Sequence, residues 1–490
     1  MIVTASLALL LSCARTGNKA PAPDPGPAPE PEPEPIDLVD VQAPREFRGV
    51  WIATVFNLDF PSRANLPAET GKAELQNLVG ALADRGLNTL VFQVRSEGDA
   101  MYASDLEPWS RFLSGRQGRD PGYDPLSVMI EAAHDRGLEV HAWFNPYRAA
   151  AKRGAATDPS HISVWAKKHL ISWGGVAWLD PGAKPVQDRA VEVIGDVLDR
   201  YPIDGVHLDD YFYPYPRGRK AFPDSGTYQA YRNQGGQLGR ADWRRQNVDT
   251  LVERIWTLVR DKCDHCRLGI SPFGIYRPGR PPGITGMDQV TALYADPLVW
   301  HRKGWMDYLA PQLYWPTTKR RQAYDRLLAY WNDQVNPESP LVVGLDATRA
   351  GKSGWPMSEY RTQVRLSREA SNTLGQIWFR ASPIVKNQAG IGNLLSELYA
   401  APALPLASRH TEPAAPPTVE LVEGGVTLSH PTPEAVRSYV IYRAEPAPSP
   451  TTTFDRIVQT PNVTLEPGTW AVSVVLKGAV ESQGVRVTVN

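Results

Sequence analysis

Between Arg45 and about Ala400 the sequence alternates short apolar segments with amphipathic helical patterns, and this alternation restricts the fold more than any other feature. A strand, a helix and a further strand are typical of parallel sheets, because the helix returns the chain to the starting edge. Eight apolar segments have this character. They begin at Phe47, Leu87, Leu138, Ile203, Arg267, Met306, Pro340 and Leu374. We therefore predict an α/β fold, a (β/α)8 TIM barrel, over residues 44–402.

The fourth of these segments, IDGVHLDDY, ends in two adjacent carboxylates. Side chains alternate along a strand, so Val206 and Leu208 are expected to face the helices while His207 and Asp209 face the barrel interior. Barrel enzymes carry their catalytic groups at the C-terminal ends of the strands. Asp209 is therefore the leading catalytic candidate. Asp210, one residue later, either takes part in the chemistry or orients the loop.

Other charged residues lie near the same predicted edge. An ion pair of Asp209 with Arg95 or Arg380 is the alternative explanation for a carboxylate at this place. Glu97 follows the second strand and Asp346 ends the seventh. We expect these two carboxylates to be further catalytic candidates, with a solvated or structural role as the alternative for each.

Polar and aromatic side chains gather on the faces assigned to the barrel interior and in the neighbouring loops. Four long segments follow strands two to five, namely 96–123, 148–180, 212–240 and 277–303. These loops are expected on the active-site face, where aromatic rings could hold sugars or simply pack. The candidates for substrate binding are Arg95, Asn145, Tyr147, His207, Tyr211, Gln312, Tyr314, Trp315 and Trp378.

Several kinds of chemistry find no support in the sequence. No phosphate-binding loop, dinucleotide fingerprint, Ser-His-Asp order or metal-ligand spacing stands out, so we expect no cofactor and no metal. A net charge of −1 offers no electrostatic footprint for nucleic acid. What remains is carboxylate chemistry in an aromatic cleft. Glycoside hydrolysis needs this arrangement, with one carboxylic acid that protonates the leaving oxygen and one carboxylate that attacks or activates water.

The N-terminal part of the chain is typical of an exported protein. The apolar stretch in MIVTASLALLLSC is too short to span a bilayer and indicates an export signal. Its end, Leu10-Leu11-Ser12-Cys13, resembles a lipobox, which predicts a lipoprotein signal and anchor over 1–20 with lipidation at Cys13. A plain cleaved signal is the alternative. Residues 21–43 are rich in proline and glutamate and predict an extended spacer.

Two further features concern the cysteines and the C-terminal segment. Cys263 and Cys266 are expected to form a local disulfide or to remain free thiols, because only His265 lies nearby and zinc needs four ligands. Residues 413–490 carry short strand patterns separated by proline and glycine turns, which predicts a small all-β sandwich. This segment resembles a fibronectin type III module with Trp470 and Tyr442 in its core.

Six motifs in the barrel segment closely resemble the bacterial glycosyl-hydrolase-like family ten. In chain order they are EFRGVWIATV, LVFQVRSEGDAMYASDLEPWS, LEVHAWFNPYR, WLDPG, IDGVHLDDYFYP and PQLYW. The resemblance implies an outer-membrane lipoprotein, facing the periplasm, that cleaves peptidoglycan strands stripped of their stem peptides. A cell-surface or a soluble periplasmic location is the alternative.

The family is also distantly similar to the α-amylase clan, whose nucleophilic aspartate ends the fourth strand in an arginine-x-aspartate pattern. His207-Leu208-Asp209 takes this place here, and the fifth strand, ISPFG, lacks the glutamate that serves the clan as acid. We therefore predict a cell-wall glycosidase with Asp209 as nucleophile or base and with Glu97 or Asp346 as acid. The alternatives are a hydrolase or lyase of another extracellular polysaccharide, or a non-catalytic glycan-binding barrel.

Overall fold

The computed structural model describes residues 36–152, 158–218 and 220–490. The predicted signal segment, Cys13 and most of the predicted spacer lie outside these residues. Within the part of the chain that is described, no helix combines the length and the apolarity that crossing a bilayer requires.

Eight parallel strands close into a barrel in the spatial order β10-β11-β12-β2-β3-β4-β8-β9. Each of the eight predicted apolar segments coincides with one of them to within a few residues, so the predicted barrel is confirmed. The strands are β2 (Phe47–Ile52), β3 (Thr89–Arg95), β4 (Glu139–Phe144), β8 (Gly205–Leu208), β9 (Arg267–Ile270), β10 (Tyr308–Leu309), β11 (Leu341–Asp346) and β12 (Thr373–Phe379).

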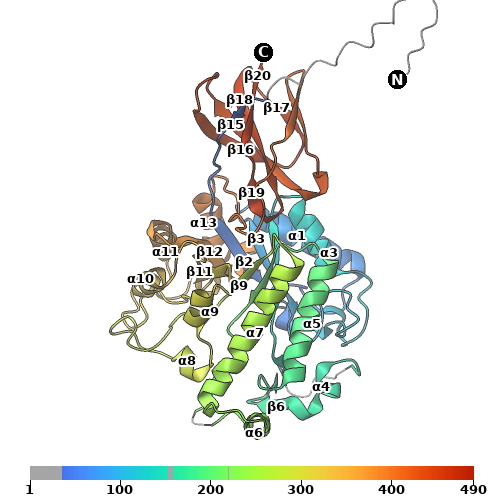
Figure 1. Cartoon of the computed structure of the whole chain (residues 1–490), viewed down its shortest axis with the longest axis vertical. Helices are drawn as coiled ribbons and strands as arrows, with labels where there is room; N and C mark the ends of the chain where they lie inside the picture. Colours follow the sequence, from blue (N-terminus) through green and yellow to red (C-terminus); the bar gives the residue numbers. More distant parts are fainter. Residues whose placement is uncertain (1–35, 153–157, 219) are drawn as a thin grey trace, which may run out of the picture. The chain divides into compact units, whose positions relative to one another are not determined.

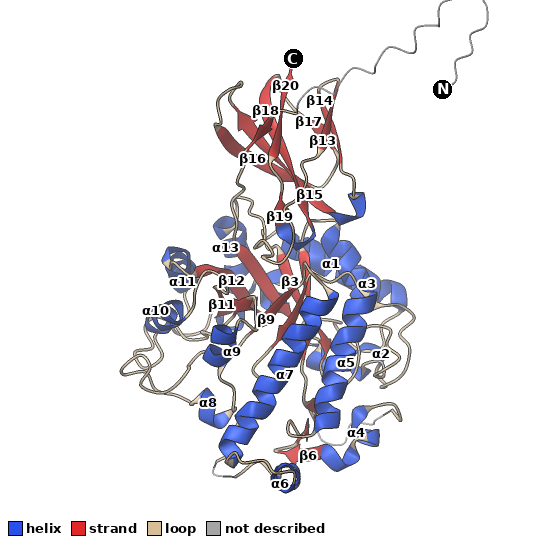
Figure 2. Ribbon diagram, in the orientation of Figure 1, coloured by secondary structure: helices blue, strands red, loops and turns tan. Residues whose placement is uncertain are grey.

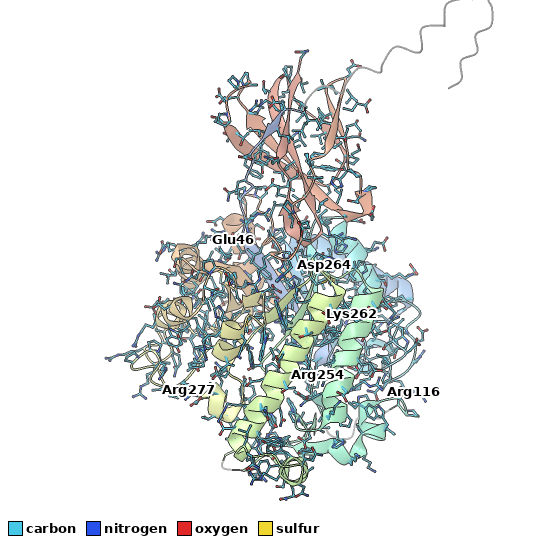
Figure 3. All side chains as sticks on the ribbon, viewed as in Figure 1. Glu46, Arg116, Arg254, Lys262, Asp264 and Arg277 are labelled. Atoms are coloured by element: carbon cyan, nitrogen blue, oxygen red, sulfur yellow. A yellow bond between two sulfur atoms is a disulfide. The ribbon has the colours of Figure 1, made fainter. Side chains whose placement is uncertain are left out.

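Helices cover the outside of the barrel (Figure 2). The principal ones are α1 (Ala68–Ala83), α3 (Pro125–His134), α5 (Lys184–Arg200), α7 (Arg240–Lys262), α9 (Pro297–Lys303), α10 (Tyr324–Gln334), α11 (Met357–Glu369), α12 (Ala381–Val385) and α13 (Ile391–Leu398). The helices α5 and α7 pack side by side (Figure 3), where Arg254 contacts Asp188 at 2.8 Å and Lys262 contacts Asp199 at 2.6 Å.

Local sequence explains where these helices begin and end. The side chain of Asp124 accepts a hydrogen bond from the backbone of Ser127, and proline follows at the first helical position of α3. Gly86 after α1 and Gly137 after α3 have φ values of 76° and 71°, the left-handed conformation that ends a helix before the next strand.

Shorter elements fill the long segments that follow the barrel strands. They are η1 (Val55–Asn57), α2 (Arg111–Ser114), β5 (Arg148–Ala150), α4 (Ile162–Trp165), η2 (Lys167–His169), β6 (Leu170–Trp173), β7 (Val176–Leu179), α6 (Ser225–Asn233), α8 (Gln289–Ala292), η3 (Ala347–Arg349) and η4 (Gln388–Gly390). The strands β5, β7 and β6 form a small antiparallel sheet after β4. Because each long segment follows the C-terminal end of a barrel strand, these elements surround one mouth of the barrel.

The C-terminal residues form two antiparallel sheets, one of order β1-β20-β18-β15-β16 with β19 on β18, and one of order β13-β14-β17 (Figure 1). Their elements are β13 (Thr418–Val422), β14 (Gly425–Ser429), η5 (Pro433–Ala435), β15 (Val436–Ala444), β16 (Thr452–Val458), β17 (Asn462–Thr464), β18 (Gly468–Leu476), η6 (Lys477–Ala479), β19 (Val480–Glu481) and β20 (Gly484–Val489). Trp470 and Tyr442 are buried between the strands, as the sequence predicted.

The larger of these two sheets, which contains β20, β18, β15 and β16, also includes a strand that the sequence did not predict. β1 (Leu38–Val39) lies within the segment assigned to the spacer and pairs antiparallel with β20 at the other end of the chain. Val39 is buried in a cluster with Val440 and Tyr442 of β15. The residues just before the barrel are therefore folded against the C-terminal sheet, because an apolar side chain every second position can complete a strand even beside a proline-rich stretch.

The sheets contact the end of the barrel at which the strands begin. Asp204, just before β8, accepts hydrogen bonds from His134 at 2.7 Å and from Arg437 of β15 at 3.0 Å. Asp307, just before β10, contacts His410 at 2.7 Å. Cys263 and Cys266 form a disulfide between α7 and β9, the first of the two predicted alternatives.

Candidate active site

A cavity of about 370 Å³ lies at the C-terminal end of the barrel strands. Four aromatic side chains form much of its wall: Trp51 from β2, Trp143 from β4, Tyr314 after β10 and Phe379 from β12. Asp209 and Asp210 are the only acidic side chains among the described residues that line it. The cavity therefore places two carboxyl groups among flat apolar rings, which suits the faces of a sugar.

Asp209 is held by three hydrogen-bond donors. The strand β8 ends at Leu208, and the side chain of Asp209 follows it into the cavity. Trp143 Nε1 donates to one carboxylate oxygen at 3.0 Å, the amide of Asn145 donates to the same oxygen, and the backbone of Tyr211 donates to the other at 3.2 Å. Burial raises the pKa of Asp209, against the opposing charge of Arg148 and these donors. Asp209 is fixed as a hydrogen-bond acceptor inside the cavity.

Asp210 has a different environment, although it is the next residue. The hydroxyl of Tyr215 donates to its carboxylate. Burial and the neighbouring charge of Asp209 raise the pKa of Asp210 to about 7. Near neutral pH a large fraction of Asp210 therefore carries a proton that it can give away. The two carboxyl groups therefore differ in environment: the charge of Arg148 opposes the rise of the pKa at Asp209, whereas the charge of Asp209 adds to the rise at Asp210.

A chain of amides orients the groups around Asp209. Gln93 Oε1 accepts from the backbone of Thr54 and Val55, each at 3.0 Å, so its amide nitrogen donates to Asn145 Oδ1 at 2.6 Å. Arg148 donates to the same oxygen at 2.6 Å. Because two donors occupy the amide oxygen of Asn145, its nitrogen is directed at Asp209.

A buried network beneath the cavity fixes the ring of Trp51. The indole of Trp51 donates to His207 Nε2 at 3.1 Å, and the other ring nitrogen of His207 lies 2.9 Å from the hydroxyl of Tyr308. Tyr308 also lies 2.9 Å from a ring nitrogen of His141. Burial lowers the pKa of His207, so the ring is neutral, accepts from Trp51 and donates to Tyr308. His207 thus positions a wall of the cavity from below.

Some of the residues predicted from the sequence come together here and others do not. The cavity lining includes Asp209, Asp210, Tyr211, Gln312 and Tyr314. Asn145 and His207 lie behind the lining and contact its members. Among the described lining residues the predicted Glu97, Asp346, Arg95, Tyr147, Trp315 and Trp378 are absent.

Glu97 and Arg95 stabilise a loop and do not line the cavity. Glu97 accepts from Arg111 at 2.9 and 3.0 Å and from the backbone of Ala151. Arg95 is buried in an ion pair with Glu107 and donates to the carbonyl of Asn145 at 2.6 Å. Each charge is neutralised by a partner from the segment that follows β3, and neither side chain lines the cavity.

Three more predicted residues have structural partners. Asp346 caps η3, where its carboxylate accepts from the backbone of Thr348 at 3.0 Å and from Arg349 at 3.1 Å. Tyr147 is buried in the outer core. Trp315 packs edge to face on Phe273 at 5.7 Å. These side chains satisfy packing or capping needs that alternation along the strand does not reveal.

Trp378 faces the helices, opposite to the predicted direction. Its indole donates to the hydroxyl of Tyr399 at 2.9 Å, while the adjacent Ile377 and Phe379 point into the barrel. The neighbouring Gln376 also faces outward and donates to Ser367 of α11 at 2.8 Å. Alternation predicts an interior position for Gln376 and Trp378, but β12 has the opposite register, and the helix layer supplies hydrogen-bond partners for both side chains.

Four functional candidates were missed or not singled out for substrate binding, namely Trp51, Trp143, Phe56 and Arg148. Phe56 lies at the cavity with 53% of its surface exposed and a φ of 56°, a conformation costly for a side chain of this size. Alternation along β4 does place Trp143 on the interior face, but Trp143 was not among the predicted binding residues. Alternation does not reach Arg148, because Pro146 interrupts the strand before β5 begins.

Comparison with known proteins identifies related sequences. Residues 46–356 match the family model described as Glycosyl hydrolase-like 10. The chain is 36% identical over 436 residues to Glycosyl hydrolase YngK of Bacillus subtilis, which covers 83% of this chain and 84% of that protein. It is 34% identical over 381 residues to Glycosyl hydrolase DigH of Escherichia coli K12, which covers 71% and 85%.

Solved structures with a related chain path include the PgaB (BpsB) glycoside hydrolase domain from Bordetella bronchiseptica. Its sequence identity is 13%, its TM-score is 0.48, and the match covers 72% of this chain and 98% of that chain.

Proposed function

Because this chain belongs to the glycosyl hydrolase-like 10 family and is a glycosidase, we propose that it cleaves the glycan strands of bacterial peptidoglycan, in particular strands that lack stem peptides. The observation that carries the proposal is the pair Asp209 and Asp210, two adjacent carboxyl groups of unequal character in one aromatic cavity. An acid and a carboxylate are what hydrolysis of a glycosidic bond requires.

The geometry supports one division of labour between these groups. Asp210, whose pKa is about 7, gives its proton to the oxygen of the leaving sugar. Asp209 bears the negative charge and either attacks the anomeric carbon or takes a proton from the attacking water. Asp210 thereby replaces Glu97 and Asp346 as the acid of the proposed mechanism.

The N-terminal sequence supports a proposed place of action. The lipobox-like Leu10-Leu11-Ser12-Cys13 supports export and a lipid anchor at Cys13. The proposed location is the outer membrane, with the protein facing the periplasm. A cell-surface or a soluble periplasmic location is the alternative. The fibronectin type III-like sandwich is proposed as a spacing or docking module.

Purified protein incubated with sacculi tests the proposal. We expect soluble fragments from sacculi whose stem peptides were removed by an amidase, and much less from untreated sacculi. Asp209→Asn should abolish this release and retain binding to the sacculi. Asp199→Asn is the matched control, because Asp199 lies on the exposed side of α5, where it contacts Lys262.

Each alternative predicts another result. Release by Asp209→Asn at the wild-type rate contradicts the role of Asp209. Binding without release by the wild-type protein supports a non-catalytic glycan-binding barrel. Digestion in water labelled with heavy oxygen distinguishes a hydrolase from a lyase. Only hydrolysis introduces an oxygen atom from water at the new reducing end.

A further inference from the structure

Arg148 brings a positive charge to the cavity without an ion-pair partner. Its side chain lines the cavity and is buried, with 9% of the residue surface exposed. No carboxylate oxygen of residues 36–152, 158–218 and 220–490 lies within 4.0 Å of its guanidinium nitrogens. A buried charge is costly unless it is paired, so a cation at a binding cavity calls for an anionic partner.

The guanidinium of Arg148 also keeps hydrogen-bond donors free. Its Nε donates to the carbonyl of Ser96 at 2.8 Å and its Nη2 donates to Asn145 Oδ1 at 2.6 Å. Arginine has five N–H donors, and Nη1 has no acceptor among the described residues. Arg148 lines the cavity, so a ligand bound there meets this guanidinium. The ring of Tyr211 covers the guanidinium at 5.2 Å.

The loop that carries Arg148 is tightly fixed. Arg95 donates to the carbonyls of Asn145 and Pro146 at 2.6 and 3.0 Å, and Glu97 accepts from the backbone of Ala151. Arg148 itself is in β5, which pairs with β7. A charge held this firmly can recognise a ligand without a further cost of ordering.

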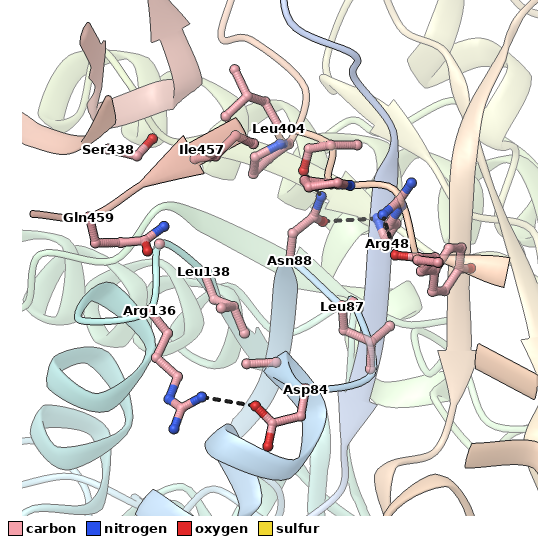
Figure 4. A pocket seen from close by; sticks show the side chains of 18 of the residues that line it. Arg48, Asp84, Leu87, Asn88, Arg136, Leu138, Leu404, Ser438, Ile457 and Gln459 are labelled. Atoms are coloured by element: carbon pink, nitrogen blue, oxygen red, sulfur yellow. Dashed lines mark hydrogen bonds and ion pairs between the residues drawn. The ribbon is translucent and has the colours of Figure 1, made fainter. Parts of the chain in front are cut away.

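The arginine at the rim of this cavity and those of the largest other cavity are neutralised by carboxylates. At the rim, Arg380 contacts Asp59 at 2.8 Å. A second cavity, of about 470 Å³, lies at the opposite end of the barrel (Figure 4), where Arg136 contacts Asp84 at 3.1 Å and Arg48 contacts Glu46 at 2.8 Å. The larger cavity therefore has no unpaired arginine that could bind an anionic ligand, in contrast to Arg148.

We propose that Arg148 binds the free lactyl carboxylate of N-acetylmuramic acid and so selects strands without stem peptides. This inference rests on the proposed function. In a strand that carries stem peptides the lactyl group ends in an amide, which has no charge and leads into a bulky chain. Removal of the stem peptide exposes a carboxylate, and guanidinium is the side-chain group best suited to pair with it.

A pair of matched substrates tests the role of Arg148. One is a purified tetrasaccharide of alternating N-acetylglucosamine and N-acetylmuramic acid with free lactyl carboxylates, and the other is its primary carboxamide. For the wild-type enzyme we expect kcat/KM to be about 10- to 100-fold higher for the carboxylate, the usual contribution of a hydrogen bond to a charged group. In Arg148→Gln the ratio should fall to near one, and Arg148→Lys should give an intermediate ratio.

The ratio separates recognition from a structural role. Arg148 also affects the pKa of Asp209 and the position of Asn145, and losses from these causes lower kcat/KM equally for both substrates. An unchanged ratio in Arg148→Gln overturns the inference. Arg349→Gln is the matched control, because Arg349 is half exposed and pairs with Asp346 outside the cavity lining. Its ratio should equal that of the wild-type enzyme.

The measurement on the wild-type enzyme separates the role of Arg148 from the proposed hydrolysis of peptidoglycan. It does not depend on the folding of any variant. Equal cleavage of both substrates overturns the role of Arg148 and leaves peptidoglycan hydrolysis intact. Cleavage of neither substrate, by a preparation whose fold is verified by circular dichroism, overturns both the inference and the function on which it rests.

Discussion

Buried carboxylates at the two ends of strand β8 have opposite electrostatic environments. Asp204 and Asp209 lie at the two ends of the same strand, β8, and both are buried. At Asp204 burial alone would raise the pKa, but the hydrogen bond and charge of His134 and the charge of Arg437 hold the pKa well below its ordinary range. At Asp209 and Asp210 burial prevails and both pKa values are raised.

The difference teaches what each end is for. Where the strands begin, Asp204 pairs with His134 of α3 and with Arg437 of β15, and Asp307 pairs with His410. These ion pairs join the barrel to the C-terminal part of the chain. Where the strands end, the carboxyl groups meet only neutral donors, together with Arg148 at longer range. A buried acid without an ion pair is poised to exchange a proton, so the unpaired end is the reactive one.

The strongest test of the reactive end is Asp210→Asn. Loss of the proton donor should lower kcat about 10²- to 10⁴-fold on the carboxylate tetrasaccharide, the usual contribution of a general acid. The protonated form of Asp210 prevails below its pKa of about 7 and declines as the pH rises, so wild-type kcat/KM should fall above this pH. The variant should lack that limb of its pH profile.

A variant of another barrel strand, β11, serves as the control. Asp346→Asn removes a carboxylate that caps η3 outside the cavity lining, and its rate and pH profile should remain close to those of the wild-type enzyme. A loss as large as that of Asp210→Asn would restore Asp346 as the acid.

The paired end should respond in stability and not in chemistry. Asp204→Ala leaves Arg437 and the backbone of Val140 without their partner, which should lower the free energy of unfolding by about 3 to 5 kcal/mol. The lowered pKa of Asp204 means that its contribution is present above the ordinary aspartate pKa and is lost as the pH falls. Urea unfolding at neutral and acidic pH measures both effects.

The exposed pair between Asp199 and Lys262 provides the comparison for this experiment. Asp199→Ala should change the free energy of unfolding by less than about 1 kcal/mol, because solvent screens the charges. If Asp204→Ala is no more harmful than Asp199→Ala, the ion pairs at the start of the strands do not stabilise the junction.

The smallest effect is expected at Phe56, on the rim of the reactive end. A left-handed residue with an exposed ring suggests a platform for a sugar, so Phe56→Ala should raise KM roughly 2- to 10-fold with little change in kcat. Phe56→Tyr should keep the wild-type KM. Leu421→Ala, at an equally exposed apolar residue of β13, should have no effect on activity. An unchanged KM in Phe56→Ala would show that the ring does not contact the substrate.

Strand patterns predicted the barrel and the leading carboxylate. Alternation in IDGVHLDDY placed Asp209 on the interior face, and the rule that barrel sites lie at strand ends placed it at the cavity. Both conclusions rest on local geometry, which a few consecutive residues determine. The alternation rule failed on β12. Trp378 and Gln376 face outward there, because the helix layer offers Tyr399 and Ser367 as hydrogen-bond partners.

The sequence by itself determined the barrel, its eight strands and the strand end that carries Asp209, because hydrophobic periodicity is written in neighbouring residues. Only the tertiary structure decided which charges are paired. Glu97 pairs with Arg111 and Arg95 pairs with Glu107, and both partners belong to the segment that follows β3. Arg148 has no ion pair and lies beside the cavity. Pairing depends on the path of loops that no periodicity encodes, and this path separates the reactive carboxylates from the structural ones.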